Sequence, residues 1–103
     1  MLKLNLKKSF QKDFDKLLLN GFDDSVLNEV ILTLRKKEPL SPQFQDHALK
    51  GKWKPYRECH IKADVLLVYL VKDNELILLR LGSHSELFYK LPITLKKNAT
   101  IAC

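Results

Sequence analysis

The sequence predicts one α+β domain in which a strand and two helices precede three antiparallel strands. Two patterns carry this prediction. Between residues 8 and 35, apolar side chains recur with the period of a helix, whereas after Trp53 they alternate with polar ones, as in half-buried strands. A polar, proline-containing loop, 38–52, separates the two patterns. We expect a single domain over 1–88, followed by a C-terminal tail of unknown role, 89–103.

The first strand and the first helix follow directly from the N-terminal pattern. Leu2, Leu4 and Leu6 alternate with polar residues, which predicts a short half-buried strand. Ser9 is the expected cap of a helix that ends at 20–21, where Asn-Gly favours a left-handed residue. The apolar positions of this helix have helical spacing: Phe10, Phe14, Leu17 and Leu18.

A second helix is expected to follow at once and to pack antiparallel to the first. Asp23, Asp24 and Ser25 offer capping side chains, and 36–37, a Lys-Lys pair, suits the negative end of the helix dipole. One apolar stripe runs along this helix: Val26, Val30 and Leu34. The short connection predicts a helical hairpin.

Three strands are expected at 56–61, 64–71 and 75–81, joined by two-residue turns at Lys62-Ala63 and Asp73-Asn74. These turns set a register in which His60 lies opposite Val65 and Glu58 opposite Leu67. In the second hairpin, Leu67 lies opposite Arg80 and Val65 opposite Gly82. Directly opposed residues share a face.

One face of this meander is therefore polar at one end, where Glu58, His60 and Arg80 gather, and His84 follows two residues after Gly82. The other face is expected to pack on the helices, and its members are apolar: Cys59, Ile61, Leu66, Val68, Leu70, Ile77, Leu79 and Leu81.

Composition narrows the class of protein. Eighteen Lys and Arg against 12 Asp and Glu give a net charge of +6, which favours a polyanion or an acidic protein as partner. We find no apolar stretch long enough to span a membrane and no signal peptide, so we expect a cytoplasmic protein. Cys59 and Cys103 do not form a disulfide framework.

The three histidines, His47, His60 and His84, converge if the loop folds over the end of the sheet. Imidazoles exchange protons near neutral pH, as cleavage of RNA requires. A zinc site that also uses Asp64 is the competing use, but the spacing of common zinc motifs is missing, so we expect no metal. No G-x-S-x-G elbow and no phosphate-binding glycine loop are present, and no cofactor is expected.

Three blocks of sequence, 46–51, 53–64 and 80–88, resemble in order and spacing the YafQ branch of the RelE/ParE superfamily of bacterial toxins. The resemblance implies a RelE-like fold and an endoribonuclease that cleaves mRNA on the ribosome and is silenced by a cognate acidic antitoxin. Two departures stand out: Ala63, where relatives often have Pro, and the tail beyond the third block.

The resemblance also implies which residues act. The family's functional positions fall on five residues here: His47, His60, Asp64, His84 and Phe88. Glu58 and Arg80 match positions that line the site in relatives. We expect the histidines to transfer protons, Arg80 to stabilise the phosphate, Glu58 or Asp64 to orient an imidazole, and Phe88 to stack on a base.

A basic stretch around Trp53 is the expected contact for mRNA or ribosomal RNA phosphates: Lys50, Lys52, Lys54 and Arg57. The alternative for this stretch is a solvated loop. For the whole chain, the alternative to a nuclease is a non-catalytic RNA- or protein-binding module whose histidines are structural. An acidic antitoxin is compatible with both.

Overall fold

The computed structural model describes residues 1–88, except the side chain of Phe88, and the expected tail lies outside the described residues. The elements follow in chain order: β1 Lys3–Leu6, α1 Lys8–Leu19, α2 Ser25–Arg35, η1 Pro42–Phe44, β2 His47–Ala48, η2 Gly51–Trp53, β3 Arg57–Lys62, β4 Val65–Lys72, β5 Glu75–Gly82 and α3 His84–Phe88. The loop expected at 38–52 therefore contains a short strand and a 3₁₀ turn, and a second 3₁₀ turn begins at its end, at Gly51.

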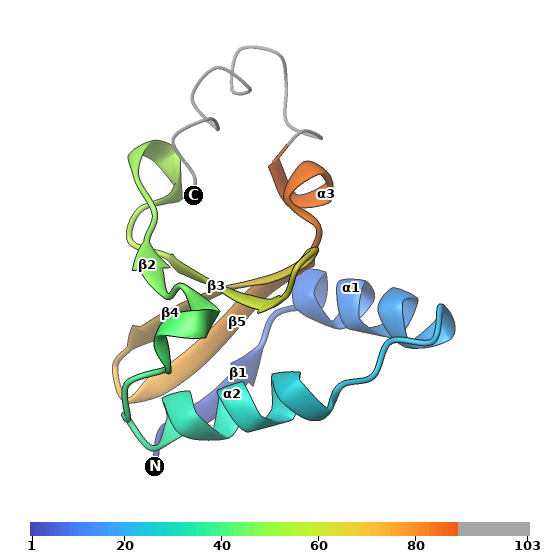
Figure 1. Ribbon diagram of the computed structural model, residues 1–103. Helices are drawn as coiled ribbons and strands as arrows, with labels where there is room; N and C mark the ends of the chain where they lie inside the picture. Colours follow the sequence, from blue (N-terminus) through green and yellow to red (C-terminus); the bar gives the residue numbers. More distant parts are fainter. Residues whose placement is uncertain (89–103) are drawn as a thin grey trace.

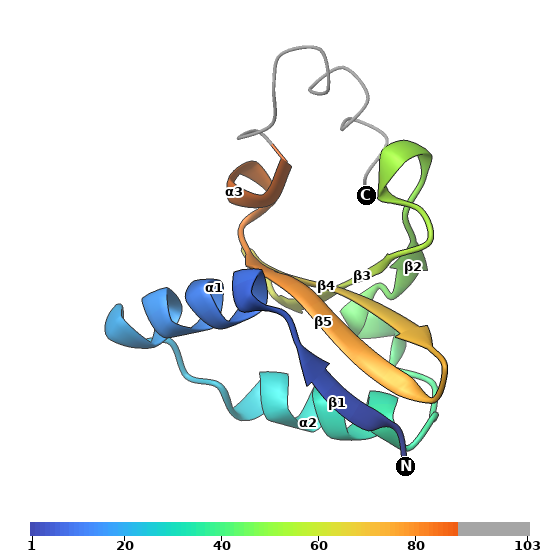
Figure 2. The ribbon, with the colours of Figure 1, turned by 180° about the vertical axis from the view of Figure 1, so that it is seen from behind.

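The strands form one sheet in the order β1-β5-β4-β3-β2. β1 lies parallel to β5, and the other neighbours are antiparallel. Helices α1 and α2 cover one face, while α3 and the segment that contains η2 rise from the opposite side (Figures 1 and 2). This arrangement confirms the expected α+β fold and adds an outer strand, β2, beside β3.

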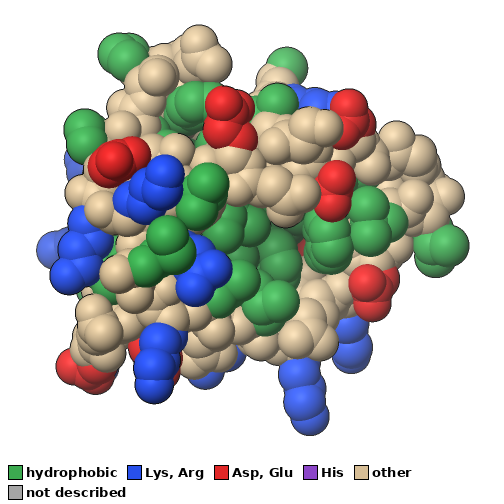
Figure 3. Space-filling view, turned by 90° about the horizontal axis from the view of Figure 1, so that it is seen from below, with side chains coloured by type: hydrophobic (Ala, Val, Ile, Leu, Met, Phe, Trp, Pro, Cys, Tyr) green, Lys and Arg blue, Asp and Glu red, His purple; other side chains and the backbone are tan. Residues whose placement is uncertain are grey.

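The helix-side core contains Phe10, Val30 and Leu34, as the helical pattern predicts. Leu27 belongs to this core as well, whereas Val26 is only partly buried against it. Seen from below, the molecule shows hydrophobic side chains in a hollow with charged side chains around it (Figure 3). No helix within residues 1–88 has the length and apolar character needed to cross a membrane.

The helix caps differ in part from those predicted. Lys7, not Ser9, occupies the N-cap of α1, and the Ser9 hydroxyl instead donates a hydrogen bond of 2.6 Å to the carbonyl of Leu79. At α2, the Asp23 carboxylate accepts hydrogen bonds from the backbone N–H and the hydroxyl of Ser25, as an aspartate before a helix is expected to do.

The predicted register of β3 on β4 is wrong by one residue. The turn residues are Ala63 and Asp64, so Lys62 lies opposite Val65, and a bulge before Lys62 places His60 opposite Leu66. Glu58 consequently lies opposite Val68 rather than Leu67. A bulge inserts one extra residue in one strand and shifts every later pair, which the assumption of regular hairpins misses.

The register of the second hairpin, β4 with β5, also differs from the prediction by one residue. Its turn is the predicted Asp73-Asn74, with φ of 52° and 65°. The ladder then skips Leu79, so that Val68, not Leu67, lies opposite Arg80. The Ser9 hydroxyl bonds the carbonyl of this skipped residue.

Because both shifts run in the same direction, Glu58 and Arg80 remain in one row across three strands, now through Val68. Leu67 and Tyr69 pack instead in the helix-side core with Cys59, Ile61 and Leu81. Leu66 and Val68 form a second apolar cluster with Leu49 and Leu87, against which Trp53, Tyr56 and Leu79 pack. Leu70 and Ile77, expected in the helix-side layer, are only half-buried.

Candidate active site

Glu58 is the only buried charged residue among those described, with a fully buried side chain in β3. It lies directly opposite His47 of β2 in the ladder. Glu58 Oε1 is 3.4 Å from His47 Nε2 and 3.9 Å from His60 Nε2, so one carboxylate oxygen faces two imidazoles. The two rings lie 6.4 Å apart, centroid to centroid.

The imidazole of His47 is oriented from its other side. Its Nδ1 lies 2.7 Å from the carbonyl oxygen of Gln45. A carbonyl only accepts, so Nδ1 carries the hydrogen and Nε2 faces Glu58. A proton on either Nε2 or the carboxyl makes this contact attractive, and the pair is therefore suited to hold one proton between them.

Electrostatics at the cluster favour neutral forms. Burial raises the pKa of Glu58, while His47 and His84 oppose the rise. Burial lowers the pKa of His60, and His47 and His84 lower it further. His47 and His84 are therefore close enough for their charges to act on both Glu58 and His60.

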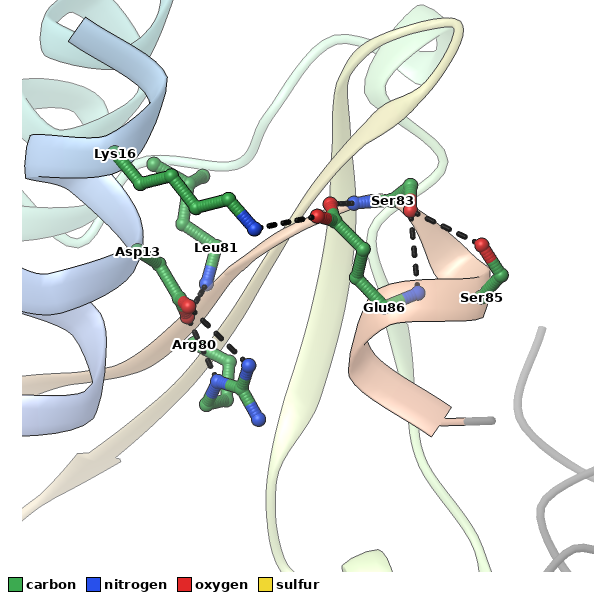
Figure 4. A network of polar contacts seen from close by, with 7 residues as sticks. All are labelled: Asp13, Lys16, Arg80, Leu81, Ser83, Ser85 and Glu86. Atoms are coloured by element: carbon green, nitrogen blue, oxygen red, sulfur yellow. Dashed lines mark hydrogen bonds and ion pairs between the residues drawn. The ribbon is translucent and has the colours of Figure 1, made fainter. Parts of the chain in front are cut away.

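A capping box formed by Ser83 and Glu86 begins α3 (Figure 4). His84 is the first residue of this helix. The Ser83 hydroxyl accepts a hydrogen bond of 3.2 Å from the N–H of Glu86, and Glu86 Oε1 accepts one of 3.1 Å from the N–H of Ser83. Lys16 of α1 lies 3.5 Å from Glu86 Oε2. Leu87 fixes the helix to the second apolar cluster.

Arg80 is held by helix α1. Its Nε donates to Asp13 Oδ2 at 2.7 Å and its Nη2 to Oδ1 at 3.2 Å, and Asp13 Oδ2 also accepts from the N–H of Leu81 (Figure 4). The guanidinium is thus oriented in a bidentate pair through Nε and Nη2, and within residues 1–88 Nη1 forms no hydrogen bond.

In the structure, the lysines of the basic stretch and its arginine have different surroundings. Lys50, Lys52 and Lys54 are exposed around η2, and Trp53 is half-buried against the second apolar cluster. Arg57 pairs with Asp46 through two hydrogen bonds of 3.3 Å. Three lysines therefore project into solvent, whereas Arg57 already has a carboxylate partner.

Two expected residues stand apart from the cluster. Asp64 lies in the exposed β3–β4 turn and makes no hydrogen bond or ion pair with residues 1–88. Phe88 ends α3, but its side chain lies outside the described part of the chain.

Sequence reasoning missed the residues that hold the site together. Asp13, Gln45 and Asp46 orient Arg80, His47 and Arg57, respectively. Asp13 and Asp46 reach their partners from 67 and 11 residues away, and the Gln45 contact uses a backbone carbonyl, so none of the three leaves a recognisable side-chain pattern. The capping box is different, because Ser83 followed by Glu86 three residues later is a signature that the sequence displays.

Comparison with known proteins decides the family. A model of the bacterial toxin YafQ of type II toxin–antitoxin systems matches residues 2–89. The chain belongs to the YafQ toxin family. The putative toxin YafQ of Haemophilus influenzae is 38% identical over 92 residues, which cover 82% of this chain and 90% of that protein. The mRNA interferase toxin YafQ of Escherichia coli K12 is 39% identical over 57 residues, 55% of this chain and 62% of that one.

Solved YafQ-family structures share the fold. The copper-bound L66S mutant toxin from Helicobacter pylori is 94% identical, with a TM-score of 0.84 over 85% of this chain and 100% of that chain. YafQ in the E. coli DinJ-YafQ complex is 29% identical, with a TM-score of 0.78 over 85% and 99%.

The copper in that H. pylori toxin raises the question of a metal site in this YafQ-family chain. Within residues 1–88, no three His, Cys, Asp or Glu side chains are arranged to hold a metal ion. The described residues therefore do not fit a three-donor site.

Proposed function

We propose that this YafQ-family chain is an mRNA interferase, an endoribonuclease that uses its own side chains as acid and base. The names of the curated E. coli relatives support the activity. The single observation that carries the chemistry is the buried carboxylate of Glu58, one oxygen of which faces both His47 and His60.

His60 is the proposed general base. Its lowered pKa keeps the imidazole neutral at pH 7, and a neutral imidazole accepts a proton. As His60 takes the proton of a ribose 2′-hydroxyl, the 2′-oxygen attacks the adjacent phosphorus. The bond from 2′-oxygen to phosphorus forms, and the bond from phosphorus to the 5′-oxygen breaks.

His84 is the proposed general acid, which gives its proton to the departing 5′-oxygen. It enters the cluster from α3, on a different segment from His47 and His60, and its charge acts on both Glu58 and His60. The Arg80 guanidinium, oriented by Asp13, stabilises the extra negative charge on the phosphate.

Glu58 and His47 are proposed to position and share protons. A carboxylate beside His60 stabilises the imidazolium that forms when this residue accepts a proton. The contact distances favour Glu58 over Asp64 for this role, because Asp64 lies in the exposed turn.

Charge and exposure support the proposed partners. Lys50, Lys52 and Lys54 are exposed, so their charges reach RNA phosphates, of the mRNA or of the ribosome. Membership of a type II toxin family implies an antitoxin partner, and the net charge of +6 favours an acidic one. The proposed place of action is the cytoplasm, where mRNA is translated.

The decisive experiment compares wild type with His84→Ala and, as a matched control, Lys72→Ala, an exposed residue at the far end of β4. After induction, growth and mRNA cleavage are followed, and circular dichroism verifies folding of each purified protein. We expect His84→Ala to cleave about a hundredfold less and Lys72→Ala to match wild type. A folded His84→Ala that cleaves like wild type would instead favour the non-catalytic binding module.

A further inference from the structure

A pocket of about 430 Å³ lies beside the histidine cluster, and His60 is the one residue of its lining to which the chemistry above gives a role as acid or base. One wall is the end of β3, with His60 and Lys62, and the other is the segment around η1, from Gln43 to Gln45. His60 belongs to both the pocket and the cluster. The Gln45 carbonyl, at the far wall, is the group that orients His47.

The pocket exists because β2 is short. Its two residues pair with Arg57 and Glu58 only, so the outer edge of β3 beyond Glu58 has no strand partner within residues 1–88. Gln45 has a left-handed backbone (φ 48°), which turns the chain between η1 and β2. An uncovered strand edge presents backbone donors and acceptors, which a ligand with a polar edge can pair with.

The walls combine three kinds of group. Gln43 and Gln45 are exposed and carry amides that both donate and accept hydrogen bonds. The half-buried Phe44 packs against the helix-side core, which fixes its ring. Lys62 is the only charged residue among the described residues that line the pocket, so no carboxylate there repels a phosphate-bearing ligand. Amides, an aromatic ring and free backbone groups are what proteins use to read unpaired RNA bases.

We propose that this pocket binds an unpaired base of the substrate RNA, that of a nucleotide next to the bond that is cut. The inference rests on the proposed function and extends it, since it assigns the choice of cleavage sequence to Gln43 and Gln45. Shared use of His60 places the base next to the reacting ribose. The amides and the β3 edge hydrogen-bond the polar edge of the base, and Phe44 offers an apolar surface beside them.

The first test maps cleavage sites in cellular mRNA at nucleotide resolution for wild type, Gln43→Ala, Gln45→Ala and Gln45→Glu. Gln11→Ala, an exposed glutamine on α1, is the matched control. Loss of the Gln43 amide is expected to reduce the preference at one position beside the cut about fivefold, with total cleavage retained. For Gln45→Ala, at the residue whose carbonyl orients His47, the same loss of preference is measured relative to the variant's own total cleavage. Gln45→Glu, whose carboxylate only accepts, is expected to shift the preference toward bases that present an amino group there.

A second measurement does not depend on cleavage. A short single-stranded oligoribonucleotide with one 2′-deoxy position, which cannot be cut there, is titrated into the isotope-labelled full chain and followed by NMR. The amide signals of residues 43–45 and of Ala63 are expected to shift, and to shift less in Gln45→Ala. Signals that move only elsewhere would overturn the pocket assignment.

The two proposals fail in different ways. Cleavage maps of Gln43→Ala and Gln45→Ala that overlay that of an active wild type refute the base pocket and leave the nuclease intact. A wild type that never cleaves, yet whose residues 43–45 respond to the oligoribonucleotide, refutes the nuclease and retains the pocket as an RNA-binding site. A response of this segment to antitoxin but not to RNA would assign the pocket to the protein partner and overturn the inference.

Discussion

Asp13 of α1 and Arg80 of β5 form a bidentate pair, and the same carboxylate also accepts the N–H of Leu81. The side chain is thus both the orienting partner of a proposed catalytic guanidinium and an acceptor for the edge of β5 beside α1. We expect Asp13→Ala to destabilise the protein by about 1–3 kcal/mol, because it leaves a partly buried N–H and guanidinium without their acceptor. Urea unfolding measures this loss.

Activity distinguishes orientation of Arg80 from support of the fold. Asp13→Asn keeps an oxygen that accepts from the N–H of Leu81 but removes the charge that Arg80 faces. We therefore expect the cleavage rate to fall by a larger factor than the equilibrium constant for folding. Asp15→Ala, an exposed aspartate on the same helix, is the control and should change neither. An Asp13→Asn variant that cleaves like wild type would contradict a role through charge.

Glu86 is expected to matter through Ser83 and not through Lys16. Glu86→Ala removes the carboxylate that accepts from the N–H of Ser83, while the backbone N–H of residue 86 still donates to the Ser83 hydroxyl. With half of the capping box lost, His84 is expected to shift, and cleavage should fall about tenfold or more while most of the fold remains. Lys16→Ala removes only an exposed ion pair and should leave cleavage unchanged. Single-turnover cleavage of a model RNA measures both, and a loss in Lys16→Ala of the same size would refute this assignment.

His60 is expected to make stability depend on pH. Its pKa is lower in the folded chain than the ordinary 6.5, so the unfolded state binds a proton more readily and stability falls as pH drops below about 6.5. The raised pKa of Glu58 acts in the opposite sense, since the folded state then takes up a proton more readily. Comparison of wild type with His60→Gln isolates the first effect.

Unfolding curves at pH 7 and pH 5.5 are therefore expected to show a larger loss of stability on acidification in wild type than in His60→Gln. The same loss in both proteins would contradict the lowered pKa of His60.

Leu49 is expected to connect the position of His47 to the second apolar cluster. It is 2% exposed and packs with Leu66, Val68 and Leu87. Leu49→Ala should cost about 2 kcal/mol or more and should lower cleavage, because the segment after β2 loses its anchor. Leu32→Ala, which is 45% exposed on α2, should be nearly neutral. Thermal unfolding and RNA cleavage of the two variants test the contrast.

Cys59 is expected to be inert in the folded protein. It is fully buried, and burial raises the pKa of its thiol to about 12, so thiolate is scarce near neutral pH. In a Cys103→Ser background, a thiol reagent should modify Cys59 only at the rate at which the domain opens. Fast labelling without denaturant would contradict the packing of β3 against the helices.

The sequence allowed the elements to be predicted better than their pairing. Periodicity identified both helices and all three long strands, since the pattern of buried side chains is a local property. The register failed at Ile61 and Leu79, because a bulge changes no composition and is stabilised by distant partners such as the Ser9 hydroxyl. Both bulges move the opposed residue of β4 from Leu67 to Val68. Glu58 and Arg80 therefore still lie in one row, although the predicted pairing through Leu67 was wrong.

In the candidate site, too, the residues could be predicted from the sequence better than the contacts between them. His47 was expected to arrive from a loop, and it arrives from a two-residue strand that pairs it with Glu58. A strand of two residues is too short to show an alternation of apolar and polar side chains. The pairing of His47 with Glu58 is therefore visible only in the three-dimensional structure. Arg57, expected to contact RNA, is engaged by Asp46, a partner eleven residues away with no sequence signature.

The parallel pairing of β1 with β5 has a consequence for synthesis of the protein. Leu4 lies opposite Leu76, so the first strand joins the sheet only through the last one. Contacts between residues so far apart in sequence form late, after the chain that links them is complete. While β5 is still inside the ribosome, the nascent chain therefore cannot complete its sheet or place α3 beside Glu58. The proposed site therefore forms only after residues 75–88 have left the ribosome, and shorter nascent chains lack it.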